Sequence, residues 1–296
     1  MFSTKAIWIK LCFKESNIDA TTLLMLRMLL SLPLYILMLL YLKKRNAQPL
    51  KKSHYIWAIA LGLLGYYLSS LFDFIGLQYV SAGIERIILF IYPTLAVLIN
   101  FWIFKVPITK KQWLAISITY IGIAIAYWGE FSNLPNTSNF VFGSVMVLLC
   151  GITYAFYLVG TGKLVPLMGS SIYTSIAMLA ASAGIFSHYL VRSIYSNGFM
   201  NAISYQIPTN IVWYIVGLAL FATVIPSFLL SSGMKRIGSN DLAIITSIGP
   251  VSTLFQANFI LKEPLLWQQA IGTAFVIAGV VLVQKFGVNT THPENA

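Results

Sequence analysis

The chain has 296 residues, of which 58% are hydrophobic and only 9% are charged, and its 19 basic and 8 acidic side chains give a net charge of +11. Soluble domains carry about 25% charged residues. The composition therefore excludes a cytosolic enzyme, a disordered chain and a secreted disulfide scaffold.

Nine apolar stretches are long enough to cross a bilayer, whose hydrocarbon core needs roughly 20 helical residues. They lie at about residues 22–42, 55–78, 83–104, 112–129, 140–161, 171–190, 211–232, 241–261 and 265–284. A shorter apolar stretch at 1–13 contains Lys5 and Lys10. These stretches predict an all-α integral membrane protein in which ten helices form the bundle and the first helix is cut short.

The basic residues fall mostly on one side of the predicted membrane. If the loop at 43–54 is cytoplasmic, twelve Lys and Arg residues lie in cytoplasmic loops or the tail, three lie on the opposite side, and four lie within apolar segments. This bias is typical of the positive-inside rule, and it explains the basic excess without nucleic acid. We expect a multi-pass protein of the cell (inner or plasma) membrane, with both termini cytoplasmic if the first segment spans.

The sequence repeats itself with an offset of 157 residues. The offset aligns Gly76 with Gly233, Pro93 with Pro250, Lys105 with Lys262, Pro107 with Pro264 and Gly122 with Gly279. It covers an odd number of spans, so the second copy enters the membrane from the opposite side, as in many secondary transporters. We expect five-helix repeats at 1–130 and 140–285, followed by a cytoplasmic tail at 286–296.

The first helix lacks part of its repeat counterpart. The partner of the stretch 140–161 would begin about 15 residues before Met1. We expect a truncated first helix, for example from a mis-assigned start codon; the alternative is a genuine half-helix.

Charged side chains lie within the apolar stretches of the first half only. A charge at the bilayer centre costs at least about 2.5–3.5 kcal/mol, so such residues pair with one another or face a cavity. Asp73, Glu85, Arg86 and Arg27 are placed to meet near the external mouth, together with Lys10, and Lys5 is the remaining charge of this set. One interpretation is structural ion pairing of Asp73 with Arg86 and of Glu85 with Arg27 or Lys10. In the functional interpretation, Asp73 or Glu85 couples transport to protons, or Arg86 anchors a substrate carboxylate. The excess of cations in this set favours an anionic or zwitterionic ligand.

Prolines and aromatic residues add candidates for a binding cavity. Pro93 and Pro250 fall within apolar stretches at matching repeat positions, and proline breaks a helix. Such breaks indicate the binding site in transporters built this way, although a simple packing kink is the alternative. Among the tyrosines, Tyr92, Tyr154 and Tyr157 are the preferred cavity-lining residues. The pairs Gly122/Ala126 and Ala274/Ala278 suit close helix contact within one chain or in a homodimer.

Catalytic and cofactor motifs are missing from the sequence. It contains no GxxxxGK[ST], HExxH or GxSxG motif, and its three histidines are far apart. We therefore predict no enzymatic activity, no cofactor and no metal site.

Two pairs of segments resemble the EamA family of the drug/metabolite transporter superfamily, and the resemblance covers almost the whole chain. They are GLQYVSAGIERIILFIYPT with FKVPITKKQW, and GMKRIGSNDLAIITSIGP with ILKEPLLWQQAIGTAFVIAG. The resemblance implies ten helices, a central cavity lined by helices 1, 3, 4, 6, 8 and 9, and export or import of small metabolites such as amino acids, sugars and drugs. The acid that the family tends to carry before its fifth helix is Glu263 in the second copy but Val106 in the first, which argues against an essential acid at that turn.

The sequence thus predicts a secondary transporter that works by alternating access and exports a small polar metabolite, an amino acid or drug-like compound, in exchange for protons. One alternative is a metabolite importer or a lipid-linked sugar flippase, the latter marked by a lateral opening between helices. Another is an integral-membrane enzyme acting on lipid, which would need catalytic groups clustered at one interface. A third is an inactive paralogue, if the first helix is absent.

Overall fold

A computed structural model describes residues 2–43, 51–133, 137–197, 209–229 and 248–286, and these residues form helices and no strands. Eight helical segments among them are long and apolar enough to cross a membrane. The helices are α1 (Lys5–Glu15), α2 (Ala20–Lys43), α3 (Lys52–Gly62), α4 (Ser69–Gly76), α5 (Ala82–Leu89), α6 (Tyr92–Phe104), α7 (Lys110–Phe131), α8 (Ser138–Met168), α9 (Ser170–Asn197), α11 (Val212–Ala219), α13 (Gly249–Gln256) and α14 (Trp267–Lys285). Wider π-helical turns occupy Leu63–Leu68, Leu220–Val224 and Ala257–Leu261, and 3₁₀ turns occupy Phe2–Thr4 and Thr209–Ile211.

The predicted spans agree with these segments to within a few residues at most ends, and the all-α membrane bundle is confirmed. The largest differences are at α8 and α9, which continue beyond the predicted ends at 161 and 190 to Met168 and Asn197. Of the predicted span at 241–261, residues 241–247 lie outside the described part of the chain, and the remainder forms α13 and the π-helical turn after it. The short apolar stretch at the start of the chain forms α1.

Elements of the two halves recur at the offset of 157 residues. The helix α7 begins at Lys110 and α14 at Trp267, and the π-helical turns at Leu63–Leu68 and Leu220–Val224 also begin 157 residues apart. Lys105 and Lys262 each end a helix in the left-handed conformation, with φ of 57° and 61°. A non-glycine residue adopts this conformation uncommonly, so its recurrence at equivalent positions shows that the two copies share their backbone geometry.

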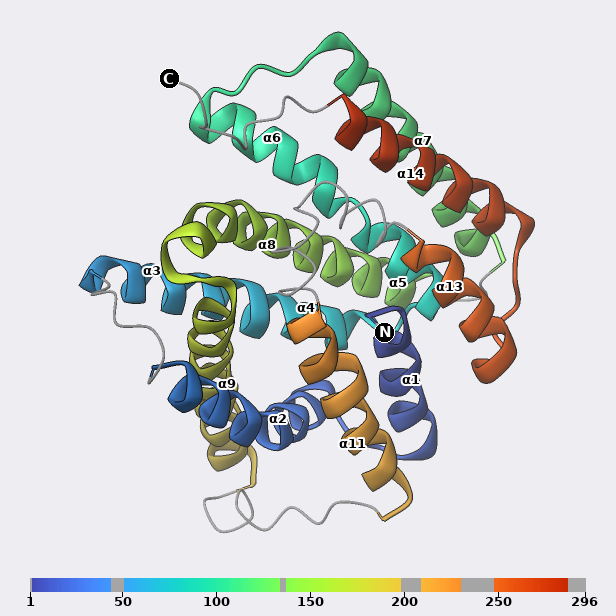
Figure 1. Cartoon of the computed structure of the whole chain (residues 1–296). Coiled ribbons are helices and arrows are strands. Elements are labelled where there is room, and N and C mark those ends of the chain that lie inside the picture. Colours follow the sequence, from blue (N-terminus) through green and yellow to red (C-terminus); the bar gives the residue numbers. More distant parts are fainter. Residues whose placement is uncertain (1, 44–50, 134–136, 198–208, 230–247, 287–296) are drawn as a thin grey trace, which may run out of the picture.

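The pairing of α7 with α14 shows that the second copy is inverted. The two helices lie side by side in Figure 1. A Cβ built on Gly129 would meet Gln268, near the start of α14, whereas one built on Gly279 would meet Thr119 and Ala115. The helices are therefore antiparallel, although each is the last helix of its own repeat. The expected glycine contact is present at Gly122, which faces Gly272, while Ala274 and Ala278 lie on the exposed face of α14.

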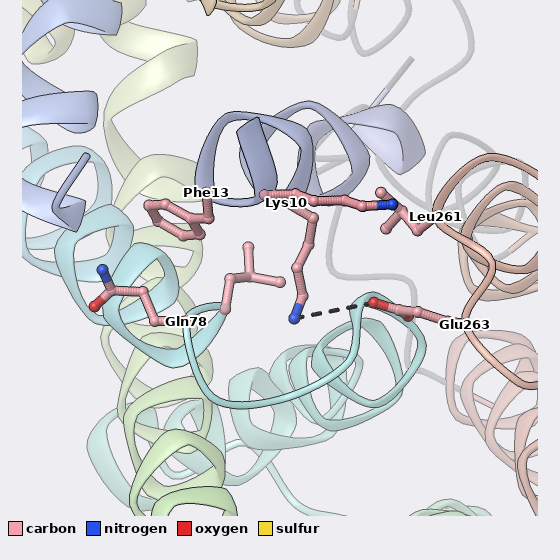
Figure 2. A pocket seen from close by; sticks show the side chains of 7 residues that line it. Lys10, Phe13, Gln78, Leu261 and Glu263 are labelled. Carbon is pink, nitrogen blue, oxygen red and sulfur yellow. Dashed lines mark ion pairs between the residues drawn. The ribbon is translucent and has the colours of Figure 1, made fainter. Parts of the chain in front are cut away.

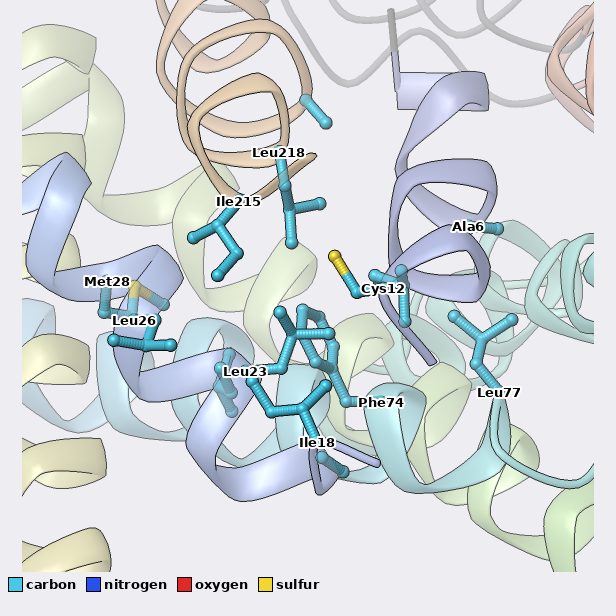
Figure 3. Close-up of a cluster of buried hydrophobic side chains, with 14 of the residues drawn as sticks. Ala6, Cys12, Ile18, Leu23, Leu26, Met28, Phe74, Leu77, Ile215 and Leu218 are labelled. Atoms are coloured by element: carbon cyan, nitrogen blue, oxygen red, sulfur yellow. The ribbon is translucent and has the colours of Figure 1, made fainter. Parts of the chain in front are cut away.

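Apolar side chains fill the interior and also cover the outside of the bundle. The largest buried cluster joins α1, α2, α4 and α11 around Cys12, Leu23, Phe74 and Leu218 (Figure 3). On the outside, Trp102, Trp213 and Phe259 are 73%, 77% and 79% exposed; further large apolar residues accompany them. A soluble protein rarely exposes so much apolar surface, whereas lipid tails solvate it.

Candidate functional site

A break in the predicted span at 83–104 places two charges inside the bundle. Ser81 caps α5, its Oγ accepting a hydrogen bond of 3.2 Å from the backbone N–H of Ile84. The helix stops at Leu89, and α6 begins at Tyr92 with Pro93 in its first turn. We had expected Pro93 to lie within one continuous helix. Proline cannot donate the backbone hydrogen bond that would continue α5, and Pro93 therefore lies in the first turn of a new helix. Pro250 occupies the matching place in the first turn of α13.

Two buried carboxylates lie together at the level of α5. Asp73 is completely buried, and its Oδ2 lies 2.6 Å from the Nζ of Lys5. Glu85 is also completely buried, and it interacts electrostatically with Asp73, Lys5 and Arg86. No donor group among the described residues hydrogen-bonds either oxygen of Glu85, and its contact is with the carboxyl group of Asp73. Two carboxyl groups in contact favour binding of a proton or of a cationic partner, so this pair is available to a proton or to a polar ligand.

The two candidate arginines occupy different places. Arg86 lies over the ring of Phe90, 5.6 Å from its centre, and a Cβ added to Gly249 would lie 2.9 Å from its Nη2. Arg86 therefore joins the broken span of the first repeat to the start of α13, beside Pro250. Arg27 instead donates a hydrogen bond of 3.1 Å to Ser70 and packs on Phe74.

The ion pairs differ from those that the sequence suggested. Asp73 pairs with Lys5 and not with Arg86, and Lys10 pairs with Glu263. Sequence spacing could place these charges near one end of the bundle. It could not show that α1 enters between α4, α5 and α13 and brings its two lysines to different carboxylates.

Tyrosines form a connected row that leads away from the charges. The ring of Tyr92 lies 5.7 Å from Phe90 and 5.1 Å from Tyr154, and Tyr154 stacks on Tyr157 at 5.6 Å. The hydroxyl of Tyr157 donates a hydrogen bond of 2.9 Å to that of Tyr66. The structure thus brings the three predicted tyrosines together, between Arg86 and the end of the bundle where α8 meets α9.

Contacts between the two repeats close the end of the bundle opposite to the junction of α8 with α9. Glu263 lies 3.9 Å from the Nζ of Lys10 (Figure 2) and accepts hydrogen bonds of 3.0 and 3.3 Å from the backbone N–H of Ala82. Burial raises the pKa of Glu263 above its ordinary value, although the charge of Lys10 and the hydrogen bond from Ala82 oppose this. Beside it, Glu130 accepts hydrogen bonds of 2.7 Å from Ser81 and 2.6 Å from Gln269. We call these six residues (Lys10, Ser81, Ala82, Glu130, Glu263 and Gln269) the inter-repeat latch.

A small polar cavity lies beside the latch. Its volume is about 310 Å³, and its lining residues are Lys10, Phe13, Lys14, Leu77, Gln78, Leu261 and Glu263 (Figure 2). The loop charges predict that this end of the bundle faces the outside. Lys5, Glu130 and Glu263 were not among the predicted site residues: Lys5 was noted only as a charge within an apolar stretch, and the acid at Glu263 was not expected to be essential. Among the described residues, no group of three His, Cys, Asp or Glu side chains could hold a metal ion.

Comparison with known proteins gives a family, several relatives and a similar fold. The model of the EamA-like transporter family matches residues 1–128 and 141–284. The uncharacterized transporter YcbK of Bacillus subtilis (strain 168) is 32% identical over 282 residues, which cover 94% of this chain and 88% of that protein. The uncharacterized transporter YetK of the same organism is 27% identical over 251 residues, covering 83% and 72%. A crystal structure with 16% sequence identity superposes with a TM-score of 0.60 over 95% of this chain and 94% of its own, and so has the same fold.

Proposed function

The chain belongs to the EamA-like transporter family and is a membrane transporter, and we propose that it exports a small polar metabolite, an amino acid or drug-like compound, by alternating access. The observation that carries the proposal is the group of Lys5, Asp73, Glu85 and Arg86 inside the bundle, in which both carboxylates are completely buried. Charges are retained inside a membrane protein where they serve a transport path. Here they lie between the latch and the row of tyrosines.

The group has a natural role in recognising a polar substrate. Two cations and two carboxylates balance one another, so an incoming anionic or zwitterionic group can exchange partners without leaving an isolated charge in the interior. Arg86 is the proposed anchor for the anionic part of the substrate, because it lies against Gly249 at the start of α13. Tyr92, Tyr154 and Tyr157 provide the adjoining wall. Movement of one repeat relative to the other would change the surroundings of Arg86 directly.

Coupling to protons is the second part of the proposal. Asp73 and Glu85 interact with each other inside the bundle, and adding one proton to this pair changes the balance of the four-charge group. A substrate that carries its own charge competes with that proton for the same group. Exchange of substrate for protons follows where a cationic group of the substrate pairs with the carboxylate that the proton would neutralise, because one carboxylate cannot hold both at once.

Flux measurements in proteoliposomes test the coupling. Asp73→Asn and Glu85→Gln remove one carboxylate charge each with little change in shape, and we expect each to abolish the acceleration of transport by a pH gradient. Asp19→Asn is the matched control, because Asp19 is a carboxylate that pairs with Arg192 at the surface, and this variant keeps the acceleration. A pH dependence in Asp73→Asn and Glu85→Gln equal to that of the unmodified protein would remove the coupling role from both residues. Screening should begin with amino acids and cationic compounds.

A lipid-linked sugar flippase is the second candidate, because the structure has a groove on its outer surface between helices. The groove is lined by α2, α3, α8 and α9. Its floor, however, is closed by direct contact of α3 with α9, since a Cβ on Gly62 would lie 2.4 Å from the backbone oxygen of Ala177. A lateral path for a lipid-linked sugar would need an opening at this place, so we favour the polar metabolite.

A further inference from the structure

The groove on the outer surface is larger than the cavity beside the latch, with a volume of about 960 Å³. Its lining residues come from α2, α3, the end of α8 and α9, and Figure 1 shows where these helices lie. Its lining is mostly apolar, and none of the described residues that line it is charged: Leu39, Tyr55, Ile59, Leu63, Pro166, Leu167, Met168, Gly169, Ile172, Ile176, Leu179, Ala180, Ala183, Gly184 and Ser187.

The groove has the dimensions of a bound hydrocarbon chain. On α9 it extends from Ile172 to Ser187 along a single face, which is roughly 22 Å at 1.5 Å per residue. This length runs from one membrane interface past the middle of a hydrocarbon core about 30 Å thick. Water would find few hydrogen-bond partners on such a lining, so an apolar chain is the fitting occupant.

Close helix packing separates the groove from the interior of the bundle, which favours a resident molecule over a transported one. One turn before its limit at Ser187, a Cβ on Gly184 would lie 2.8 Å from Leu63 and 3.2 Å from Tyr67, so α9 packs closely on the π-helical turn there. The floor is the contact of Gly62 with Ala177 described above. A chain in the groove therefore has no path to Asp73 and Glu85.

Positive charge marks the open end. Tyr55, Ile59 and Leu63 lie on one face of α3 and line the groove, and Lys52 precedes Tyr55 by three residues, which places it on the same face one turn nearer the membrane surface. Lys51 caps the helix beside it, and both lysines are exposed. Lysines at a cytoplasmic interface attract anionic lipid headgroups. The loop charges assign this end to the cytoplasm.

We propose that the groove binds an anionic phospholipid, with an acyl chain along α9 and its phosphate beside Lys51 and Lys52. The inference does not depend on the transported substrate. Its physical basis is the match between an apolar groove of acyl-chain length and two cations at its mouth.

Native mass spectrometry of the full-length protein with phosphatidylglycerol or phosphatidylcholine tests the proposal. We expect retention of phosphatidylglycerol to fall about tenfold in Ala183→Trp, because the indole fills the groove. The matched control is Ala274→Trp on the exposed face of α14, which keeps the bound lipid. In Lys51→Gln/Lys52→Gln the preference for phosphatidylglycerol over phosphatidylcholine should fall about 30-fold, as the loss of two interfacial cations implies.

Circular dichroism and size-exclusion chromatography of each variant separate lipid loss from misfolding. Equal phosphatidylglycerol retention by folded Ala183→Trp and Ala274→Trp would overturn the proposed site. Unchanged headgroup preference in the double lysine variant would overturn the assignment to an anionic lipid. Scrambling of a fluorescent phospholipid in proteoliposomes that is blocked by Ala183→Trp would also overturn it, because the groove would then be a transport path.

Discussion

Asp19 makes two kinds of contact at the start of α2, and they can be separated by one substitution. Its carboxylate accepts hydrogen bonds from the backbone N–H groups of Thr21 and Thr22, at 3.1 and 3.3 Å, and pairs with Arg192. Burial raises its pKa, but the hydrogen bonds of Thr22 and the charge of Arg192 outweigh burial, so the pKa of Asp19 lies below its ordinary value.

We expect Asp19→Asn to lose part of the acid dependence of stability. A depressed pKa in the folded state stabilises the protein above the unfolded value of about 3.9, and this contribution disappears as the pH falls through the lower folded value. Asparagine is itself a good helix cap, so the hydrogen bonds to α2 persist. Thermal unfolding in detergent between about pH 3 and 6 should show a smaller decrease in Tm on acidification for the variant. Identical acid profiles for both proteins would contradict the role of the charge.

The sequence could indicate those site residues that a local pattern reveals, but not those that depend on long-range contacts. Asp73, Glu85 and Arg86 were found because a charge inside an apolar stretch is costly wherever the stretch packs. Their partners depend on which helices meet, and Lys5 reaches Asp73 only because α1 packs against α4. Glu263 follows the end of an apolar stretch, where a charge is ordinary, so no local pattern revealed that it binds the N-terminus of α5.

At the scale of elements, the close packing of α7 on α14 reverses the usual effect of a helical glycine. Replacing glycine by alanine inside a helix normally stabilises it by roughly 0.5–1 kcal/mol. At Gly122 the added Cβ would lie 2.6 Å from the carbonyl oxygen of Gly272. Overpacking of this kind costs typically 1–3 kcal/mol, so the cost outweighs the gain.

We therefore predict that Gly122→Ala lowers the stability by roughly 1–2 kcal/mol. Gly162→Ala is the matched control within α8, since a Cβ there would meet nothing within 4 Å, and it should raise the stability slightly. Thermal unfolding of the two variants in the same detergent measures both effects. Stabilisation by both substitutions would show that α7 and α14 do not approach each other this closely.

Element positions were predictable where hydrophobic length sets them. The spans follow from lipid thickness, whereas Pro93 was expected to lie within one continuous helix and instead begins α6. The π-helical turns at Leu63–Leu68 and Leu220–Val224 were not predicted. Their sequences are apolar like the neighbouring helices, and a π-helix differs from an α-helix only in the carbonyl to which each backbone N–H donates its hydrogen bond. Packing of neighbouring helices, and not composition, decides that choice.

At the scale of the whole molecule, the two repeats meet at two levels with different physical character. The interface of α7 with α14 is made of small residues in close backbone contact, which suits a permanent joint. The inter-repeat latch is made of hydrogen bonds and one ion pair, which can break at modest cost where water is present. A transporter that opens to the outside by moving its repeats apart would separate the latch and keep the joint.

Cross-linking across the latch tests this division. In a variant without Cys12 and Cys150, we would replace Lys10 and Glu263 by cysteine and join them with a short cleavable thiol reagent, because the two original side chains meet at their tips (Figure 2). We expect the cross-link to stop transport in proteoliposomes and its cleavage to restore the rate measured before joining. The same reagent applied to Thr109→Cys/Gln112→Cys, two positions on one turn of α7, should leave transport unchanged, since that turn moves as a unit. Undiminished transport with the latch fully cross-linked would mean that this end does not open during the cycle, and that alternation occurs elsewhere between the repeats.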